Sequence, residues 1–157
     1  MSFIQLTTFV AAPIERVFDL SRSIDLHKSS MQSYTEKPIA GKLHGLMEQN
    51  DTVTWQARHL FKQRTLQVRI SAMQRPYSFI DEQVKGDFVS MKHEHYFKPI
   101  ENGTIMIDQF YFEPPFGFIG KVVNQFYLIN YMKKLLEQRN KFIKQVAESS
   151  QWKTYLS

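Results

Sequence analysis

The sequence predicts an α+β fold in which a curved antiparallel sheet of six to seven strands wraps around a long C-terminal helix, with two short helices after the first strand. Two observations carry this prediction. Residues 52–113 form a series of short β-rich runs separated by turn signals, and residues 116–148 carry apolar side chains at helical spacing. One helix of that length can bury its apolar stripe only if the sheet curls around it. The concave face of the sheet is therefore a candidate cavity.

The composition indicates one domain, residues 1–157. A chain of 157 residues with 43% hydrophobic content can build a single sizeable core. The absence of cysteine excludes a disulfide framework, a thiol nucleophile and a cysteine-ligated metal, and it favours a cytoplasmic location. The first ten residues lack the pattern of a signal peptide, and no window approaches the roughly 18 apolar residues of a spanning helix. We therefore expect no stable membrane insertion.

The net charge of +5 is concentrated in the C-terminal helix and is typical of a solvated basic helix face. Binding to nucleic acid needs clustered phosphate contacts and a recognisable module, and we find neither. We expect no nucleic-acid partner, whereas peripheral contact with an anionic membrane stays open. The basic residues are Lys121, Lys133, Lys134, Arg139, Lys141 and Lys144, against Glu137 and Glu148.

The N-terminal residues predict one strand and two short helices. Residues 3–10 alternate and are rich in β-formers, which favours a strand. Pro13 suits the start of a helix, and Ser23 can cap a second helix over residues 24–31. Residues 34–39 then return the chain to an extended conformation.

Five further strands and the long helix follow. Asn102-Gly103 is the strongest hairpin signal, because a type I′ turn needs two residues that accept a positive φ. Pro114-Pro115 ends the sheet, and the next residues predict an amphipathic helix of about 30 residues. The expected strands are 52–60, 65–74, 77–85, 89–98 and 104–113.

Turn positions predict which residues face one another across the sheet. We place two-residue turns at Lys62-Gln63, Arg75-Pro76 and Asn102-Gly103, and a three-residue loop at Gly86-Asp87. Side chains then sort into one mainly apolar face and one polar face, as expected for a sheet with one face in water. The predicted pairs are Trp55 with Ile70, His59 with Leu66, Ile70 with Asp81, Ala72 with Phe79, Asp81 with His93, His93 with Phe112 and His95 with Phe110.

The mainly apolar face also carries imidazoles and carboxylates. Burying such groups costs several kcal/mol unless they find partners, water or a ligand, and ligand pockets show the same mixture. In one interpretation these polar groups only satisfy one another beneath the helix. In the other they contact a ligand, and the candidate ligand-binding residues are Trp55, His59, Phe79, Asp81, Gln83, Met91, His93, His95, Asp108, Phe110, Phe112 and Phe126.

Five segments of the chain carry a family resemblance. They are Ala12-Pro13-Ile14-Glu15-Arg16-Val17-Phe18, Gly103-Thr104 with Asp108, Pro115-Phe116-Gly117, Phe79-Ile80-Asp81-Glu82-Gln83-Val84-Lys85-Gly86 and His93-Glu94-His95-Tyr96-Phe97. Together these segments resemble the SRPBCC superfamily of helix-grip proteins, which includes START lipid-transfer domains, the birch-pollen-allergen group and polyketide cyclase/dehydratase proteins. The resemblance covers nearly the whole chain and is closest to a bacterial subgroup in which the last two segments recur together.

The resemblance implies a START-like helix-grip domain with an internal hydrophobic cavity, for which we expect a volume of about 300 to 1,000 Å³. The first functional hypothesis is a carrier or sensor of a medium-sized hydrophobic or aromatic molecule, reached between the long helix and residues 31–46. The alternative is a cyclase or dehydratase-type enzyme that uses Asp81, His93, His95 and Asp108. A third hypothesis is a lipid handler that docks on membranes through its basic helix face.

His93 and His95 lie two residues apart on one strand face, and with Asp108 they make a two-histidine, one-carboxylate metal site conceivable. Paired histidines on a strand are more often structural, so we expect no metal. We also expect no cofactor, because no Gly-rich phosphate loop is present, and the hydroxyl side chains lack a recognisable nucleophile motif.

Overall fold

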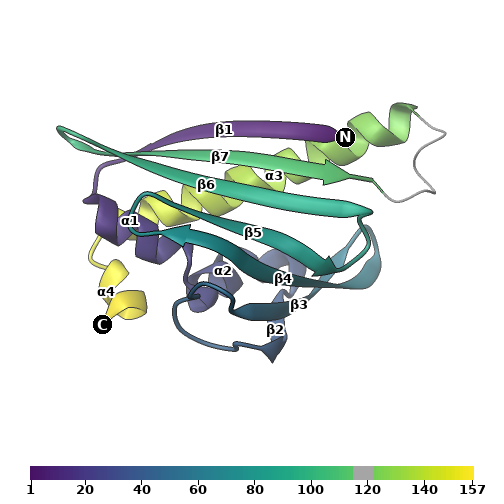
Figure 1. Ribbon diagram of the computed structural model, residues 1–157, viewed down its shortest axis with the longest axis horizontal. Helices are drawn as coiled ribbons and strands as arrows, with labels where there is room; N and C mark the ends of the chain where they lie inside the picture. Colours follow the sequence, from purple (N-terminus) through teal and green to yellow (C-terminus); the bar gives the residue numbers. More distant parts are fainter. Residues whose placement is uncertain (115–121) are drawn as a thin grey trace.

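The computed structural model describes residues 1–114 and 122–157. Seven strands form one antiparallel sheet in the order β1-β7-β6-β5-β4-β3-β2. Figure 1 shows α3 lying along this sheet, with α1 and α2 beside it. The elements are β1 (Ser2–Val10), α1 (Ile14–Ser21), α2 (Ile24–Ser30), the 3-10 turn η1 (Gln32–Tyr34), β2 (Lys37–Gly41), β3 (Thr52–His59), β4 (Lys62–Gln74), β5 (Ser78–Lys85), β6 (Ser90–Ile100), β7 (Gly103–Glu113), α3 (Val122–Ala147) and α4 (Trp152–Leu156).

The predicted fold class is confirmed. The two short helices follow the first strand, and Ser23 caps α2 by accepting a hydrogen bond from the Leu26 amide at 3.1 Å. The predicted helix over 116–148 is observed from Val122 to Ala147, and its first six residues lie outside the described part of the chain. Among the described residues, no helix is both long and apolar enough to cross a membrane.

The predicted pairing across the last hairpin is wrong by two residues. β6 continues to Ile100, which pairs with Gly103, so the turn falls on Glu101-Asn102 rather than one residue later. His95 therefore faces Asp108, and His93 faces Phe110. Because side chains alternate with a period of two, a shift of two changes the partners and preserves the face.

The β3–β4 turn also differs from the prediction. It lies at Leu60-Phe61, where both residues have positive φ values of 52° and 64°, and Trp55 consequently faces Leu66 instead of Ile70. Positive φ at both central positions is the backbone conformation of a type I′ turn, which Leu60 and Phe61 adopt although neither is Asn or Gly. The predicted pairing of His59 with Leu66 is therefore wrong, since His59 faces Lys62.

The two middle hairpins largely match the prediction. Ile70 faces Asp81, and Asp81 faces His93, as expected from the three-residue loop. A register irregularity between Ile70 and Ala72 then places Phe79 opposite Met73, which corrects the predicted pair of Ala72 with Phe79. An extra residue on one strand is the usual effect of a β-bulge.

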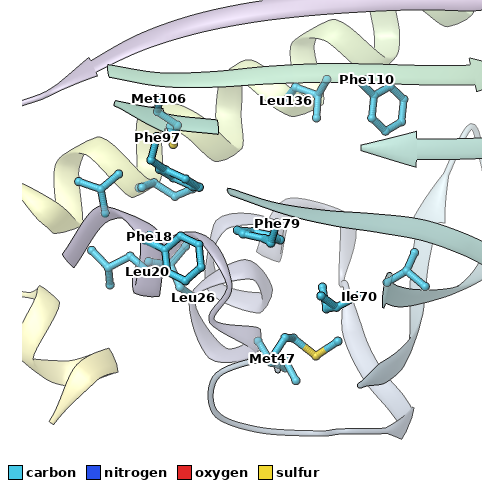
Figure 2. Packing of buried hydrophobic residues seen from close by; sticks show 14 of the residues in the cluster. Phe18, Leu20, Leu26, Met47, Ile70, Phe79, Phe97, Met106, Phe110 and Leu136 are labelled. Atoms are coloured by element: carbon cyan, nitrogen blue, oxygen red, sulfur yellow. The ribbon is translucent and has the colours of Figure 1, made fainter. Parts of the chain in front are cut away.

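The hydrophobic core fills the space between the concave face of the sheet and the helices. Phe18 of α1 meets Phe79 and Phe97 edge-on, with ring centroids 5.6 Å and 5.3 Å apart. Figure 2 shows these three rings gathered near Met106, and Phe110 and Leu136 lying farther along the sheet. This packing closes one end of the concave face, and the polar cluster described next lies beside it.

Candidate functional site

Three neighbouring strands bring four titratable side chains together on the concave face. His93 and His95 come from β6, Asp81 from the adjacent β5 and Asp108 from the adjacent β7. Residues two apart on a strand point to the same side, which explains why both imidazoles reach this face. The sequence predicted this grouping, and the side-chain contacts confirm that the four residues are in proximity.

Each imidazole is paired diagonally with a carboxylate on a flanking strand. His93 Nε2 lies 2.8 Å from Asp108 Oδ1, and His95 Nε2 lies 2.7 Å from Asp81 Oδ2. The two imidazole rings stack with their centroids 3.7 Å apart. Because an ionised carboxylate only accepts, the Nε2 atom of each ring carries a proton.

Asp108 is the most enclosed member of the cluster, with no exposed surface. Asn140 donates from Nδ2 to Asp108 Oδ2 at 2.6 Å, and Arg139 Nη1 lies 3.5 Å from Asp108 Oδ1. Burial by itself would raise the pKa of Asp108, but the hydrogen bonds from His93 and His95 and the charge of Arg139 outweigh it and hold this pKa well below its usual value. Asp108 therefore stays ionised.

The pKa values of Asp81 and His93 are also lowered by their surroundings. Burial would raise the pKa of Asp81, but the hydrogen bond and charge of His95 lower it below its usual value. Burial, assisted by the neighbouring His95, lowers the pKa of His93 from 6.5 to about 4. At neutral pH His93 is therefore a neutral ring between two carboxylates.

The cluster forms part of the wall of an inner cavity of about 200 Å³. A second, outer cavity of about 140 Å³ adjoins it through shared lining residues that include Trp55, His59 and Met132. Both are smaller than the expected 300 Å³, because the Phe18, Phe79 and Phe97 cluster fills one end of the concave face. The space suits a compact molecule.

Eight of the twelve predicted residues line the inner cavity. Asp108 lies behind His93 and does not reach the cavity wall, while Phe112 packs fully buried against Phe88 and Phe110. Gln83 also lies off the wall, where its Nε2 donates to the Phe88 carbonyl at 2.8 Å. The eight are Trp55, His59, Phe79, Asp81, Met91, His93, His95 and Phe110.

Phe126, which was predicted as a site residue, lines neither cavity. Its side chain is 63% exposed. At about 100° per residue, Phe126 lies nearly opposite Leu128 on α3. The helix contributes Leu128, Tyr131, Met132 and Leu135 to the outer cavity and Met132, Leu135, Leu136 and Arg139 to the inner one.

Arg139 is a functional candidate that was not predicted from the sequence. It was expected on the solvated basic face of the helix, but it is only 5% exposed and bridges Asp108, Asn140 and the Ser21 carbonyl. Its position four residues after Leu135 and four before Ile143 places it on the apolar stripe of α3, which was the available signal.

Two residues that line the outer cavity, His59 and Tyr131, belong to a group of packed rings. His59 Nδ1 lies 2.8 Å from the Tyr131 hydroxyl, and the Tyr34 ring lies 4.9 Å from the His59 ring. Burial lowers the pKa of His59 and raises the pKa of Tyr131 to about 12, so both side chains are neutral near pH 7. These rings join residues 31–46 to α3, where ligand access was expected.

Asp81, His93 and His95 offer donor atoms within 4.8 Å of one another. A divalent cation there would have to displace the hydrogen bond between His95 and Asp81, and Asp108 would support His93 from behind rather than act as the third ligand. The expected absence of a bound metal stays a prediction.

No family model and no curated protein matches this sequence. Solved structures that resemble it include TTHA0849 from Thermus thermophilus, with 16% identity, a TM-score of 0.70, and 94% of this chain and 100% of that chain covered. CV1439 from Chromobacterium violaceum has 13% identity and a TM-score of 0.70, and the match covers 94% of this chain and 97% of that chain. Major latex-like protein 151 from Panax ginseng has 12% identity and a TM-score of 0.67, and the match covers 94% of this chain and 98% of that chain. These similarities show that the chain has the helix-grip fold predicted from its sequence.

Proposed function

We propose that this protein binds a compact, mainly apolar ring compound in the inner cavity, as a carrier or sensor. The observation that carries the proposal is the composition of the wall, where Trp55, Phe79 and Phe110 surround a few polar groups contributed by Asp81 and His93. Small-molecule sites have this mixture of apolar surface and few convergent polar groups. The binding partner of this protein would therefore be a hydrophobic small molecule.

The volume supports a small aromatic molecule rather than a long-chain lipid. An apolar cavity of about 150 Å³ is large enough to take benzene, and the inner cavity measures about 200 Å³. The adjoining outer cavity of about 140 Å³ gives room for a substituent. The absence of cysteine supports a cytoplasmic setting for this function.

The alternative, a cyclase or dehydratase-type reaction, has one observation in its favour. His93 lines the cavity and uses only Nε2 to contact Asp108, which leaves Nδ1 for a substrate proton. General bases work best when their pKa lies near the working pH. The pKa of His93, lowered to about 4, makes it a weak base at neutral pH, so we place binding ahead of catalysis.

Filling the inner cavity should abolish binding. Val68 lines that cavity on β4, and Val68→Phe would place a ring in the space of the ligand. We expect N-phenyl-1-naphthylamine, a neutral fluorescent probe, to bind the wild-type protein and to bind Val68→Phe at least about tenfold more weakly, a loss of about 1.4 kcal/mol.

Val84→Phe is the matched control, because Val84 is an exposed residue on β5. Its affinity for the probe should equal that of the wild type. Equal probe binding by all three proteins would place the probe outside the inner cavity and contradict the proposal. Native mass spectrometry of freshly purified protein would independently detect a retained compound.

A further inference from the structure

Two hydrogen-bond acceptors at the polar end of the inner cavity receive no donor from the described residues. Asp81 accepts from His95 through Oδ2, and no described residue donates to Oδ1. His93 faces Asp108 through Nε2, and Nδ1 has no partner among the same residues. Within the described chain only Gln83 Oε1 is both fully enclosed and unpaired, so the two free acceptors are reachable from the cavity that their side chains line.

The cationic side chains that line this cavity already have protein partners. Arg139 directs Nη1 to Asn140 Oδ1 at 2.9 Å and Nη2 to the Ser21 carbonyl at 3.2 Å. Arg22 directs its guanidinium to Asp19, to the Met47 carbonyl and to Glu48. The cavity therefore presents free acceptors beside cations whose terminal nitrogens are occupied.

The charge of the polar cluster also disfavours an anionic ligand. Asp81 pairs with His95, and the Arg139 guanidinium lies 3.5 Å from the Asp108 carboxylate. His93 is neutral near pH 7, and His95 Nδ1 lies between Asp108 Oδ1 at 3.4 Å and Arg139 Nη2 at 3.5 Å. With two carboxylates and one guanidinium, the cluster has no excess of fixed positive charge, and a buried anionic ligand would lack a compensating cation.

Resting on the proposed function, we infer that the ligand is a compact ring compound bearing a hydrogen-bond donor, which is either a hydroxyl that donates to Asp81 Oδ1 or His93 Nδ1, or an amine that can donate to both. The same geometry disfavours carboxylates, which would bring a further acceptor, and pure hydrocarbons, which would leave both acceptors desolvated and unpaired. A site built around polar groups discriminates most strongly against analogues that leave those groups unpaired.

Four naphthalenes that differ only in one substituent test this ligand class. Displacement of N-phenyl-1-naphthylamine from the wild-type protein would be measured at pH 7 with 1-naphthalenemethanol, 1-naphthylmethylamine, 1-methylnaphthalene and 1-naphthoic acid. We expect the alcohol and the amine to bind at least about tenfold more tightly than the hydrocarbon, because each makes a hydrogen bond to a charged or buried acceptor. The carboxylate should bind most weakly.

The Asp81→Asn variant keeps the shape of the side chain and removes its charge. Its preference for the amine over the hydrocarbon should fall at least about tenfold, because hydrogen bonds to an ionised acceptor are about twice as strong as neutral ones. Glu82→Gln is the matched control, since Glu82 is the next residue of β5 and points to the other face. It should keep the wild-type preference.

The outcomes separate this inference from the proposed function. If 1-methylnaphthalene and the probe both fail to bind the wild type, the proposed function fails. If the hydrocarbon binds and the alcohol and amine show no preference over it, or if the carboxylate binds best, the ligand class is wrong while the binding function stands. Because the wild-type series alone decides this, the inference stays testable even if Asp81→Asn does not fold.

Discussion

Replacing Asp108 with alanine is expected to lower the free energy of unfolding by about 3 to 5 kcal/mol. Asp108 accepts from His93 at 2.8 Å and from Asn140 at 2.6 Å, and it faces Arg139 at 3.5 Å. The substitution would leave those donors buried, with the positive charge of Arg139 uncompensated. Removing one partner of a buried charged network is far more costly than removing an exposed one.

Urea denaturation at pH 7 measures this effect, and Asp87→Ala provides the control. Asp87 forms a salt bridge with Arg64 at the surface, where its side chain is half exposed, so its loss should change the unfolding free energy by less than about 1 kcal/mol. An equally small effect of Asp108→Ala would mean that water reaches the cluster, and the interpretation of Asp108 as an enclosed anchor would be wrong.

Acidification from pH 7 to pH 4 is expected to remove about 3 kcal/mol of stability through His93 alone. The folded-state pKa of His93 is lowered from 6.5 to about 4, so between these values the unfolded chain binds the proton and the folded protein does not. Stability from this group is therefore fully present above pH 6.5 and is lost as the pH falls toward 4. The titratable groups that face His93 are His95 on its own strand, Asp81 on β5 and Asp108 on β7.

Comparison of His93→Gln with the wild type isolates this contribution. The variant is expected to be less stable at pH 7, but its unfolding free energy should fall by about 3 kcal/mol less than that of the wild type between pH 7 and pH 4. His44→Gln is the control, because His44 is largely exposed and should leave the wild-type pH dependence unchanged. Identical pH profiles for His93→Gln and the wild type would rule out His93 as the source of the acid sensitivity.

The position of the polar cluster was predictable because strand periodicity is robust to errors in turn placement. The last turn lies one residue earlier than predicted and the β3–β4 turn two residues earlier, so the strand pairing differs from the prediction by two and by four residues, respectively. Both shifts are even, so His93, His95 and Asp108 stayed on the concave face. The specific pairs, such as His95 with Asp81, required the actual register and side-chain rotamers.

The α3 side of the site was less predictable. Phe126 and Arg139 each contradict the expectation from residue type, since the phenylalanine is exposed and the arginine is buried. Helix rotation relative to the sheet decides which side chains face inward, and a helix with apolar residues on more than one side leaves that rotation ambiguous in the sequence. Arg139 can be buried because Asp108 and the Ser21 carbonyl, both distant along the chain, supply its partners.

Patterns along the chain were sufficient to predict the fold class, the order of elements and the face of the sheet on which the polar cluster lies. These properties depend on local periodicity, turn residues and composition, all of which are visible without coordinates. The size of the cavity, the pairing within the cluster, the burial of Arg139 and the acceptors left free for a ligand emerged from the three-dimensional arrangement. They depend on how side chains from β5, β6, β7 and α3 fill a shared space, and no local pattern encodes that packing.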